Sequence, residues 1–311
     1  MPKNILITGA RGFIGKNLVE YLGKNFPAEY ILFYPYHKEL DLLDSDKVFQ
    51  FINDNKIEVI IHGASVGGSR KTGYDAGKTD VVSQNLRMFF NLARCLNGNR
   101  QLINFGSGAE YDLRYYQPKM SEEYFDKHVP ADAYGFSKYV ILKYIENSRN
   151  MVNLRLFGVF GKYEDFEFKF ISNAIVKNLL GLPIAINQNV FFDYIYVNDL
   201  LKMVAAFIDK TPKYKNYNAV CGKTIDLASI AHKINQIASK PSEIIIKNPG
   251  LNTEYSASNQ RILSKLKTFE FTPFEVALRE LYHYYQQNLS KIDRSVIEKD
   301  ECIKYCRTKE V

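Results

Sequence analysis

The first fifteen residues constrain the fold more than any other part of the chain. The apolar run Lys3–Thr8 leads directly into Gly9, Gly12 and Gly15, and an amphipathic stretch follows over residues 16–26. This order predicts a strand, a tight turn and a helix, which together open a dinucleotide-binding βαβ unit. Gly9 would allow the turn, Gly12 the approach of a pyrophosphate, and Gly15 the close packing of helix on strand. The phosphates would lie at the helix N-terminus, where free N–H groups and the helix dipole favour negative charge. The alternative is an ordinary βα turn.

The composition is that of an ordinary globular protein. The chain has 311 residues, of which 46% are hydrophobic and 24% charged, enough for one large domain or two interlocked ones. No apolar run reaches the ~18 residues of a transmembrane helix and no signal peptide precedes the glycine turn, so we expect a cytoplasmic protein without membrane contact. The net charge is +7, much of it in the C-terminal tail. Because no nucleic-acid recognition motif accompanies this charge, we expect anionic small molecules as ligands and no nucleic acid.

The cysteines and histidines form no recognisable site. The cysteines, Cys95, Cys221, Cys302 and Cys306, show no paired framework, which predicts free thiols in a reducing compartment. The five histidines are scattered along the chain. We therefore expect no metal site.

Strands and helices alternate through the first half of the chain. Apolar segments at residues 30–34, 58–62, 101–107 and 152–156 predict strands, with helical stretches between them. The alternation predicts an α/β fold with a Rossmann-like, doubly wound parallel sheet. His62, at the end of an apolar strand, is expected to be a packed core residue.

The second half predicts a smaller α/β lobe, which includes a helix over residues 224–239. We expect a dinucleotide-binding domain (1–160 with about 191–220), a substrate-binding lobe (161–190 and 221–290) and a basic tail (291–311). The substrate would lie between the two bodies, at the carboxyl edge of the sheet. The polar stretch at 69–79 would border it.

The end of the second predicted strand bears on the choice of cofactor. NAD-selective folds place an acidic residue about 20 residues beyond the last glycine, where it accepts from the ribose hydroxyls. Here the segment reads Pro35-Tyr36-His37-Lys38, without an acid. We therefore expect NADPH, with His37 or Lys38 near the 2′-phosphate, while NAD stays possible. Both side chains could equally be exposed loop residues.

Tyr134 and Lys138 form the candidate catalytic pair. They are four residues apart at the start of a predicted helix, which places them on one face, one turn apart. An ammonium beside a phenol favours phenolate and would lower the tyrosine pKa from about 10. Such a tyrosine can give a proton to a ketone oxygen as hydride reaches the carbon. Ser107, at the end of an earlier predicted strand, would donate a hydrogen bond to the same oxygen.

The order of these motifs resembles that of the extended short-chain dehydrogenase/reductases, the NAD-dependent epimerase/dehydratase family. The resemblance covers roughly residues 3–290 and is greatest to nucleotide-sugar-modifying members, above all 4-keto-sugar reductases of the GDP-fucose synthase type. The stretches that carry it are the glycine turn, Glu39–Asp44, Ala64–Gly68, Ser107–Tyr111 and Phe192–Asp199. It implies NADPH-dependent reduction of the keto group, at C4, of a nucleoside-diphosphate-linked keto-deoxy sugar, in the synthesis of cell-surface polysaccharides. It also implies a homodimer through the helices that begin near Thr79 and Tyr134.

The resemblance assigns further residues to the site. The catalytic residues would be Ser107, Tyr134 and Lys138. The cofactor would contact Gly9, Arg11, Gly12, Phe13, Ile14, Gly15, His37, Lys38, Asp41, Leu42, Ala64, Ser65, Tyr134 and Lys138, with Asp41 beside the adenine amino group. The substrate would contact Val66, Gly67, Ser107, Gly108, Ala109, Lys169 and Asn173.

Four positions depart from the GDP-fucose synthase pattern. Ala109 stands where that type has a cysteine, and Lys169 falls near its substrate-lobe histidine. Because those two groups epimerise the sugar and alanine cannot move a proton, we expect a plain ketone reductase. Gly158 and Phe192 replace an asparagine and an arginine that usually help to hold the substrate. The nucleotide and the sugar therefore stay open.

Two other functions are compatible with the same motifs. An epimerase or dehydratase with retained NAD would reuse Ser107, Tyr134 and Lys138. The acid-free strand end argues against it, and Glu110, the nearest candidate acid, is expected to point away from the substrate. A cofactor-binding regulator without catalysis would need none of the three residues.

Overall fold

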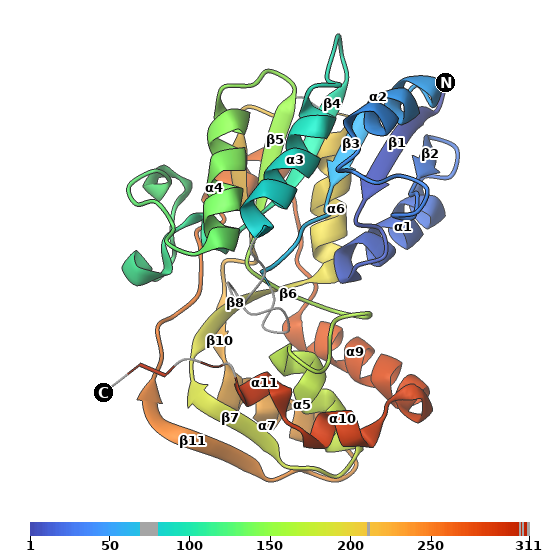
Figure 1. Ribbon diagram of the computed structural model, residues 1–311. Helices are drawn as coiled ribbons and strands as arrows, with labels where there is room; N and C mark the ends of the chain where they lie inside the picture. Colours follow the sequence, from blue (N-terminus) through green and yellow to red (C-terminus); the bar gives the residue numbers. More distant parts are fainter. Residues whose placement is uncertain (69–79, 210–211, 305, 307, 310–311) are drawn as a thin grey trace.

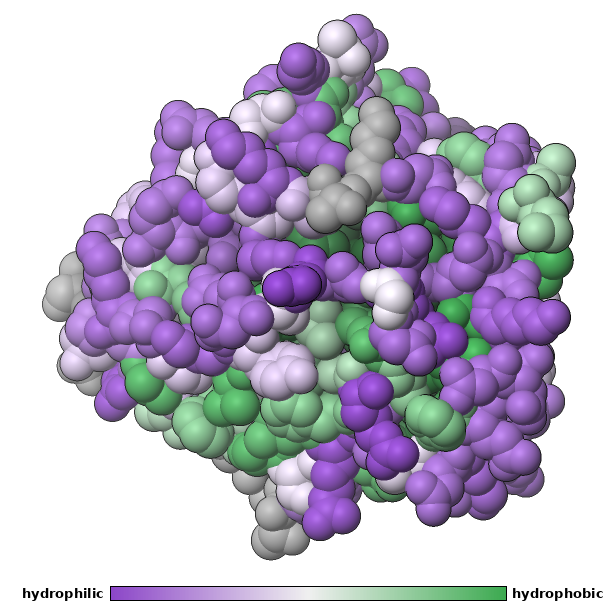
Figure 2. All heavy atoms as spheres, turned by 90° about the horizontal axis from the view of Figure 1, so that it is seen from above, coloured by the Kyte–Doolittle hydropathy of each residue, from purple (hydrophilic) through white to green (hydrophobic). Residues whose placement is uncertain are grey.

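The structure is a computed structural model that describes residues 1–68, 80–209, 212–304, 306 and 308–309. The polar stretch at 69–79, expected beside the substrate, lies outside the described residues. The chain forms two bodies, one above the other in Figure 1. Seen from above, hydrophilic residues cover most of the surface, with hydrophobic patches between them (Figure 2).

A six-stranded parallel sheet lies at the centre of the upper body. The strand order is β2-β1-β3-β4-β5-β9, and all neighbouring strands pair in parallel. The strands are β1 (Lys3–Thr8), β2 (Tyr30–Phe33), β3 (Val59–His62), β4 (Gln101–Ser107), β5 (Met151–Leu156) and β9 (Asn216–Ala219). The predicted Rossmann-like, doubly wound sheet is thereby confirmed.

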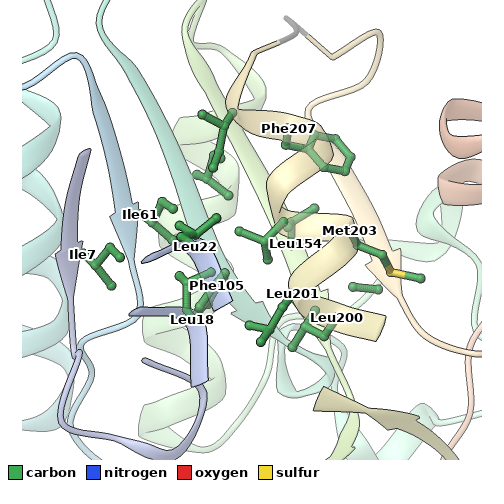
Figure 3. Packing of buried hydrophobic residues seen from close by; sticks show 14 of the residues in the cluster. Ile7, Leu18, Leu22, Ile61, Phe105, Leu154, Leu200, Leu201, Met203 and Phe207 are labelled. Carbon is green, nitrogen blue, oxygen red and sulfur yellow. The ribbon is translucent and has the colours of Figure 1, made fainter. Parts of the chain in front are cut away.

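Helices cover both faces of this sheet. One face carries α1 (Phe13–Asn25) and α6 (Val197–Ile208); the other carries α2 (Ser45–Asp54), α3 (Val81–Ala93) and α4 (Ala133–Glu146). On the first face, Leu18 and Leu22 of α1 and Leu200, Leu201 and Met203 of α6 pack over apolar strand residues (Figure 3). Because both faces are covered, the strands are apolar over most of their length.

The helix starts follow from short polar side chains in the sequence. Asp44 caps α2 by accepting from the Lys47 N–H at 3.1 Å. Asp132 caps α4 by accepting from the Gly135 N–H at 2.7 Å. The second cap fixes the first turn of α4, which carries Tyr134.

The face under α3 and α4 changes from apolar to polar towards the carboxyl ends of the strands. Leu6, Ile60, Leu102 and Met151 lie side by side across β1, β3, β4 and β5. Two residues further along each strand, the same register holds Thr8, His62, Asn104 and Asn153, all of them buried. This polar row ends the hydrophobic core beneath the first turns of α4.

The lower body combines two small sheets with helices. Its strands are β6 (Gly158–Phe160), β8 (Phe191–Tyr196) and β10 (Thr224–Asp226) in one sheet and β7 (Ile184–Asn189) and β11 (Ile244–Leu251) in the other. Its helices are α5 (Phe170–Leu179), α7 (Leu227–Ile237), α9 (Phe274–Asn288), α10 (Arg294–Glu298) and α11 (Glu301–Lys304), while α8 (Gln260–Leu266) packs against β9. Apolar faces of α5, α7 and α9 share one core.

Two features of the lower body differ from expectation. The predicted helix over 224–239 is wrong at its start, because Thr224–Asp226 forms β10 antiparallel to β8 and α7 begins at Leu227. Asp226 ends the strand and caps the helix by accepting from the Ser229 N–H at 3.0 Å. Strand β11 was not predicted.

The C-terminal tail folds onto the lower body. The Lys177 ammonium of α5 lies 2.6 Å from the Asp300 carboxylate, and Gln188 of β7 bonds the backbone of Lys309 at 2.9 Å. Part of the basic tail is thus ordered against α5 and β7.

Within the described residues, no helix combines the length and apolar character needed to cross a bilayer.

Candidate functional site

The glycine turn has the backbone geometry that a pyrophosphate site requires. Gly9 has a positive φ of 72°, and a Cβ there would lie 2.6 Å from the Gly63 carbonyl carbon. Gly12 donates to the Gly9 carbonyl at 3.0 Å and is the N-cap residue of α1. A Cβ on Gly15 would lie 2.6 Å from the Ala10 Cα, so the helix packs directly on the turn. Each expected glycine position is therefore tightly packed or left-handed.

The N-terminus of α1 suits a dinucleotide. No side chain caps this helix and its first turn, which begins with Phe13 and Ile14, contains no acidic residue. The helix is thirteen residues long, and its dipole and first N–H groups face the turn, where the helix itself supplies no acidic side chain. The residues present therefore fit the pyrophosphate of a nicotinamide cofactor.

Tyr36, in the loop after β2, contacts a cation that belongs to the glycine turn. The Arg11 guanidinium lies 3.0 Å above the ring centre of Tyr36, in a cation–π contact. His37 is exposed and lies 3.7 Å from the Asp41 carboxylate, and Lys38 is exposed. Asp41 also accepts from the Leu43 N–H at 2.9 Å.

Leu42, expected near the cofactor, is part of the core. Its side chain is buried among α2 and α3 residues, and its carbonyl accepts from the Asn91 side chain at 2.8 Å. This leaves its side chain no exposed surface of note for a ligand.

The loop after β3 runs from the glycine turn towards α4. Ala64 donates to the Thr8 hydroxyl at 3.3 Å, and Ser65 is exposed. The Asn85 amide of α3 holds both the N–H and the carbonyl of Val66, at 2.8 and 3.0 Å. Gly67 and Gly68 follow with φ values of 80° and 73°.

Tyr134 lies against this loop. A Cβ on Gly68 would overlap the Tyr134 ring, so only glycine fits at this position of the loop. Asn85 also donates to the Ser137 hydroxyl at 3.0 Å, which in turn donates to the Tyr134 carbonyl at 2.7 Å. Asn85 therefore joins α3, the Val66 loop and the first turn of α4, a role that the sequence analysis missed.

Lys138 lies one helical turn from Tyr134 and is buried. Its ammonium donates to the Phe105 carbonyl of β4 at 2.9 Å and lies 5.7 Å from the centre of the Tyr134 ring. Burial lowers the pKa of Lys138 to about 8, while the negative charge of Glu110 opposes this shift. Tyr134 and Lys138 thus lie one turn apart on α4, as their spacing predicted, and the bond to Phe105 fixes the position of the Lys138 ammonium.

His62 is a neutral neighbour of Lys138. Its Nδ1 lies 2.8 Å from the Thr8 hydroxyl, and 2% of its surface is exposed. Burial, with the charge of Lys138 in second place, lowers the pKa of His62 to about 3. The expectation of a packed core histidine is confirmed.

Ser107 ends β4 and starts a short 3₁₀ turn over Gly108–Glu110. Its hydroxyl oxygen accepts from the Ala109 N–H at 3.2 Å, and its own N–H donates to Glu110 at 3.0 Å. This capping box uses the hydroxyl of Ser107 as an acceptor. The hydroxyl proton is still available for a ligand.

Glu110 points into the core, as its place in the turn predicted. It lies 2.6 Å from the Arg155 guanidinium and accepts from the Asn153 amide at 3.0 Å. Arg155 also donates to the Tyr111 hydroxyl at 2.6 Å and to the Asn218 side chain at 2.8 Å. The sequence analysis missed this buried network, although Asn153 and Arg155 alternate with apolar residues along β5.

Lys169 and Asn173, expected to contact substrate, lie at the start of α5. Lys169 is the exposed N-cap residue of the helix. Asn173 is buried and donates to the Phe166 carbonyl at 2.9 Å. Asn173 therefore stabilises the turn before the helix, and of the two only Lys169 has an exposed side chain.

Comparison with known proteins identifies the family. The NAD-dependent epimerase/dehydratase family model matches residues 5–219. The chain belongs to this family. It is therefore an NAD(P)-dependent oxidoreductase of the extended short-chain dehydrogenase/reductase type, as the resemblance implied.

Its relatives carry names of nucleotide-sugar enzymes. ADP-L-glycero-D-manno-heptose-6-epimerase of Brachyspira hyodysenteriae is 26% identical over 305 residues, with 85% of this chain and 90% of the relative covered. The Campylobacter jejuni GDP-mannoheptose C4 reductase with NADP bound has a TM-score of 0.80 at 20% identity, with 92% and 98% covered. A GDP-L-fucose synthetase from Naegleria fowleri has a TM-score of 0.80 at 19% identity, with 93% and 94% covered. The two structures share the fold.

Proposed function

We propose that this protein reduces the keto group, at C4, of a nucleoside-diphosphate-linked keto-deoxy sugar with NADPH. The observation that carries the proposal is the pairing of Tyr134 with a buried Lys138 that donates to the Phe105 carbonyl of β4, the strand that ends at Ser107. The glycine turn follows β1, which β3 separates from β4, and would supply the cofactor site at the same edge of the sheet. The names of the relatives favour a sugar nucleotide.

In the proposed reaction, three side chains act on the carbonyl oxygen. When bound, a reduced nicotinamide would supply hydride to the carbonyl carbon. Tyr134 donates its phenolic proton to the oxygen, and the Lys138 ammonium stabilises the phenolate that is left. The Ser107 hydroxyl donates a hydrogen bond to the same oxygen as negative charge develops there. The bond from Lys138 to the Phe105 carbonyl keeps the ammonium in position.

We propose NADPH rather than NADH because Arg11 lies within the glycine turn. Stacking on Tyr36 orders the guanidinium, which can bind the 2′-phosphate of NADPH in bidentate fashion. No acidic residue stands in Pro35-Tyr36-His37-Lys38 to accept from a free 2′-hydroxyl. His37 and Lys38 would add positive charge at the rim of the same site.

The surroundings of Ser107 favour reduction over dehydration or epimerisation. Ala109 carries no ionisable group, and the carboxylate of Glu110 is bound by Arg155 and Asn153. Neither can exchange a proton with a sugar carbon. The second candidate function is epimerisation, which the name of the Brachyspira relative supports. Lys169 is then the exposed ionisable group that could serve as base.

We further propose a homodimer in the cytoplasm that serves the synthesis of cell-surface polysaccharides. Phe90 of α3 and Phe136 and Tyr144 of α4 are 37%, 38% and 44% exposed. The Phe90 and Tyr144 rings contact each other with centroids 5.0 Å apart. An aromatic surface on two adjacent helices suits a symmetric helix–helix interface.

The experiment that tests the proposed function has two parts. The purified protein is first examined for absorbance in the nicotinamide band, which a retained cofactor would produce. NADPH and NADH consumption is then measured with GDP-, CDP- and dTDP-linked 4-keto-6-deoxy sugars. We expect consumption of NADPH with at least one of them. A cofactor that co-purifies, together with no net consumption of NADPH or NADH, would support the epimerase. If no cofactor co-purifies and neither NADPH nor NADH is consumed, both functions are contradicted.

A further inference from the structure

Strand β11 is a long edge strand whose outer side is open. It has eight residues and pairs in parallel with β7, whereas β2, β6, β9 and β10, which also end their sheets, have three or four. Proteins keep edge strands short because their exposed backbone groups can pair with another chain. In Figure 1, β11 follows the outer border of the lower body. The strand therefore offers a surface for pairing with a further strand.

The backbone of β11 directs alternate residues outward. Glu243, directly before the strand, faces β7, because its carbonyl accepts from the Ile184 N–H at 2.8 Å. In a parallel ladder the N–H and C=O of one residue point to the same side, and successive residues alternate. Ile244 and Ile246 therefore direct these groups away from β7. Among the described residues, none outside the strand bonds them.

The side chains of β11 leave apolar surface at the same edge. Ile244 packs on the core of the lower body, and Ile246, which follows it on the same face, is 46% exposed. Ile245, on the opposite face, is 38% exposed. A lipid surface could cover these side chains but offers the backbone groups no partners. The edge therefore suits another β-strand.

The charges beside these isoleucines fit a second copy of the same strand. In an antiparallel pairing centred on Ile246, each Ile246 lies opposite its copy, and Ile245 lies opposite Lys247 of the second copy. Glu243 then lies diagonally from that lysine, within reach of its ammonium. The two-fold axis repeats both contacts. Over residues 243–248 this register places no like charges opposite each other, so the edge is complementary to itself.

We propose that β11 pairs with β11 of a second copy about a two-fold axis, which joins two small sheets into one of four strands, β7-β11-β11-β7. The two Ile246 residues exchange N–H···O=C bonds, and their side chains extend the core of the lower body across the axis. Pro249, which has no N–H, and the register shift between Asn248 and Leu251 end the pairing. This interface is separate from α3 and α4, so the two together would build an assembly larger than a dimer.

Sedimentation velocity at several protein concentrations tests the pairing. We expect the wild type to self-associate and Ile246→Lys to lower the mass of the assembled species at least twofold, because two lysines then face each other on the axis. Val276→Lys is the matched control. Val276 is also 46% exposed and belongs to α9, on the other side of the lower body in Figure 1. This variant should sediment as the wild type does. Circular dichroism checks that each variant is folded.

Exchange of the two charges tests the register and leaves the apolar residues in place. Lys247→Glu and Glu243→Lys should each weaken the association roughly tenfold, because like charges then meet at both symmetric positions. The double variant Glu243→Lys/Lys247→Glu should regain the affinity of the wild type, since opposite charges meet again.

Three results would overturn the inference. The first is a wild type that stays monomeric. The second is an Ile246→Lys protein whose assembled mass equals that of the wild type. The third is a double charge variant that associates no more tightly than the single variants. Because β11 carries no residue of the proposed reaction, this inference and the proposed function can fail independently.

Discussion

The carboxylate of Glu110 lies 2.6 Å from the guanidinium of Arg155, and neither side chain has exposed surface. Glu110 follows Ser107 by three residues and therefore starts next to the proposed reaction centre. The capping box and the ion pair turn it into the sheet instead. Glu110, the only carboxylate in the 3₁₀ turn after Ser107, thus stabilises the fold through its bonds to Arg155 and to the Ser107 N–H.

Breaking this ion pair should lower stability without removing activity. We expect Glu110→Gln to reduce the free energy of unfolding by roughly 3–5 kcal/mol, because it leaves the Arg155 charge buried and unpaired. The double variant Glu110→Leu/Arg155→Met should lose less than either single variant. Denaturant unfolding measures both effects. A kcat that falls by two orders of magnitude in folded Glu110→Gln protein would instead place Glu110 in the chemistry.

The pH dependence of reduction should report on Lys138. Burial lowers its pKa to about 8, and the proposed mechanism needs the charged form. We therefore expect kcat/KM of the wild type to fall as pH rises through about 8. Because the pKa in the folded protein is below the unfolded value, the unfolded chain binds more protons between the two values. Lys138 thus makes the free energy of unfolding rise with pH in that window.

Lys138→Met is the control for this profile. This variant should lose most of the activity, and its residual kcat/KM should not decrease as pH rises through about 8. Its free energy of unfolding should lack the increase with pH that Lys138 contributes. A wild-type profile that stays flat through this range would contradict the assigned role.

Arg11 should determine the preference for NADPH. We expect Arg11→Ala to raise KM for NADPH by roughly ten- to a hundredfold, the equivalent of about 1.5–3 kcal/mol for a hydrogen bond to a charged group. KM for NADH should change little. Tyr36→Ala should produce a smaller shift in the same direction, because it removes the ring that orders the guanidinium. Equal effects on the two cofactors would contradict a contact with the 2′-phosphate.

Glu164 should make the lower body less stable at high pH. Burial raises its pKa to about 7, although the Ser172 hydroxyl, 2.5 Å away, donates to it and opposes the shift. The folded form therefore holds its proton more tightly than the unfolded chain, and the free energy of unfolding falls as pH rises from about 4.5 to 7. We expect Glu164→Gln to weaken this fall, and urea unfolding at several pH values measures it. An unchanged pH dependence in the variant would contradict the buried acid.

Local patterns in the sequence predicted much of the fold, the geometry of the glycine turn and the pairing of Tyr134 with Lys138. Gly9, Gly12 and Gly15 act within seven residues of one another, and Tyr134 and Lys138 are joined by one helical turn. In such cases the chain itself fixes the geometry. The parallel sheet followed from the alternation of apolar strands with helices.

Contacts between distant residues were not predictable in the same way. Arg155 and Glu110 are 45 positions apart, and Tyr255 reaches Gly108 from beyond β11. Strand β11 itself was missed, because its residues Lys247, Asn248, Pro249 and Gly250 resemble a turn. Such contacts depend on how elements distant in the sequence pack, and no local spacing encodes them.

The most direct test of the account is reduction of a 4-keto sugar nucleotide by Tyr134→Phe protein under single-turnover conditions with NADPH. We expect the rate of NADPH oxidation to fall by roughly 10²–10⁴-fold, the usual contribution of a positioned general acid, while the affinity for NADPH is unchanged. A variant that binds NADPH and oxidises it at a rate close to that of the wild type would contradict the central claim.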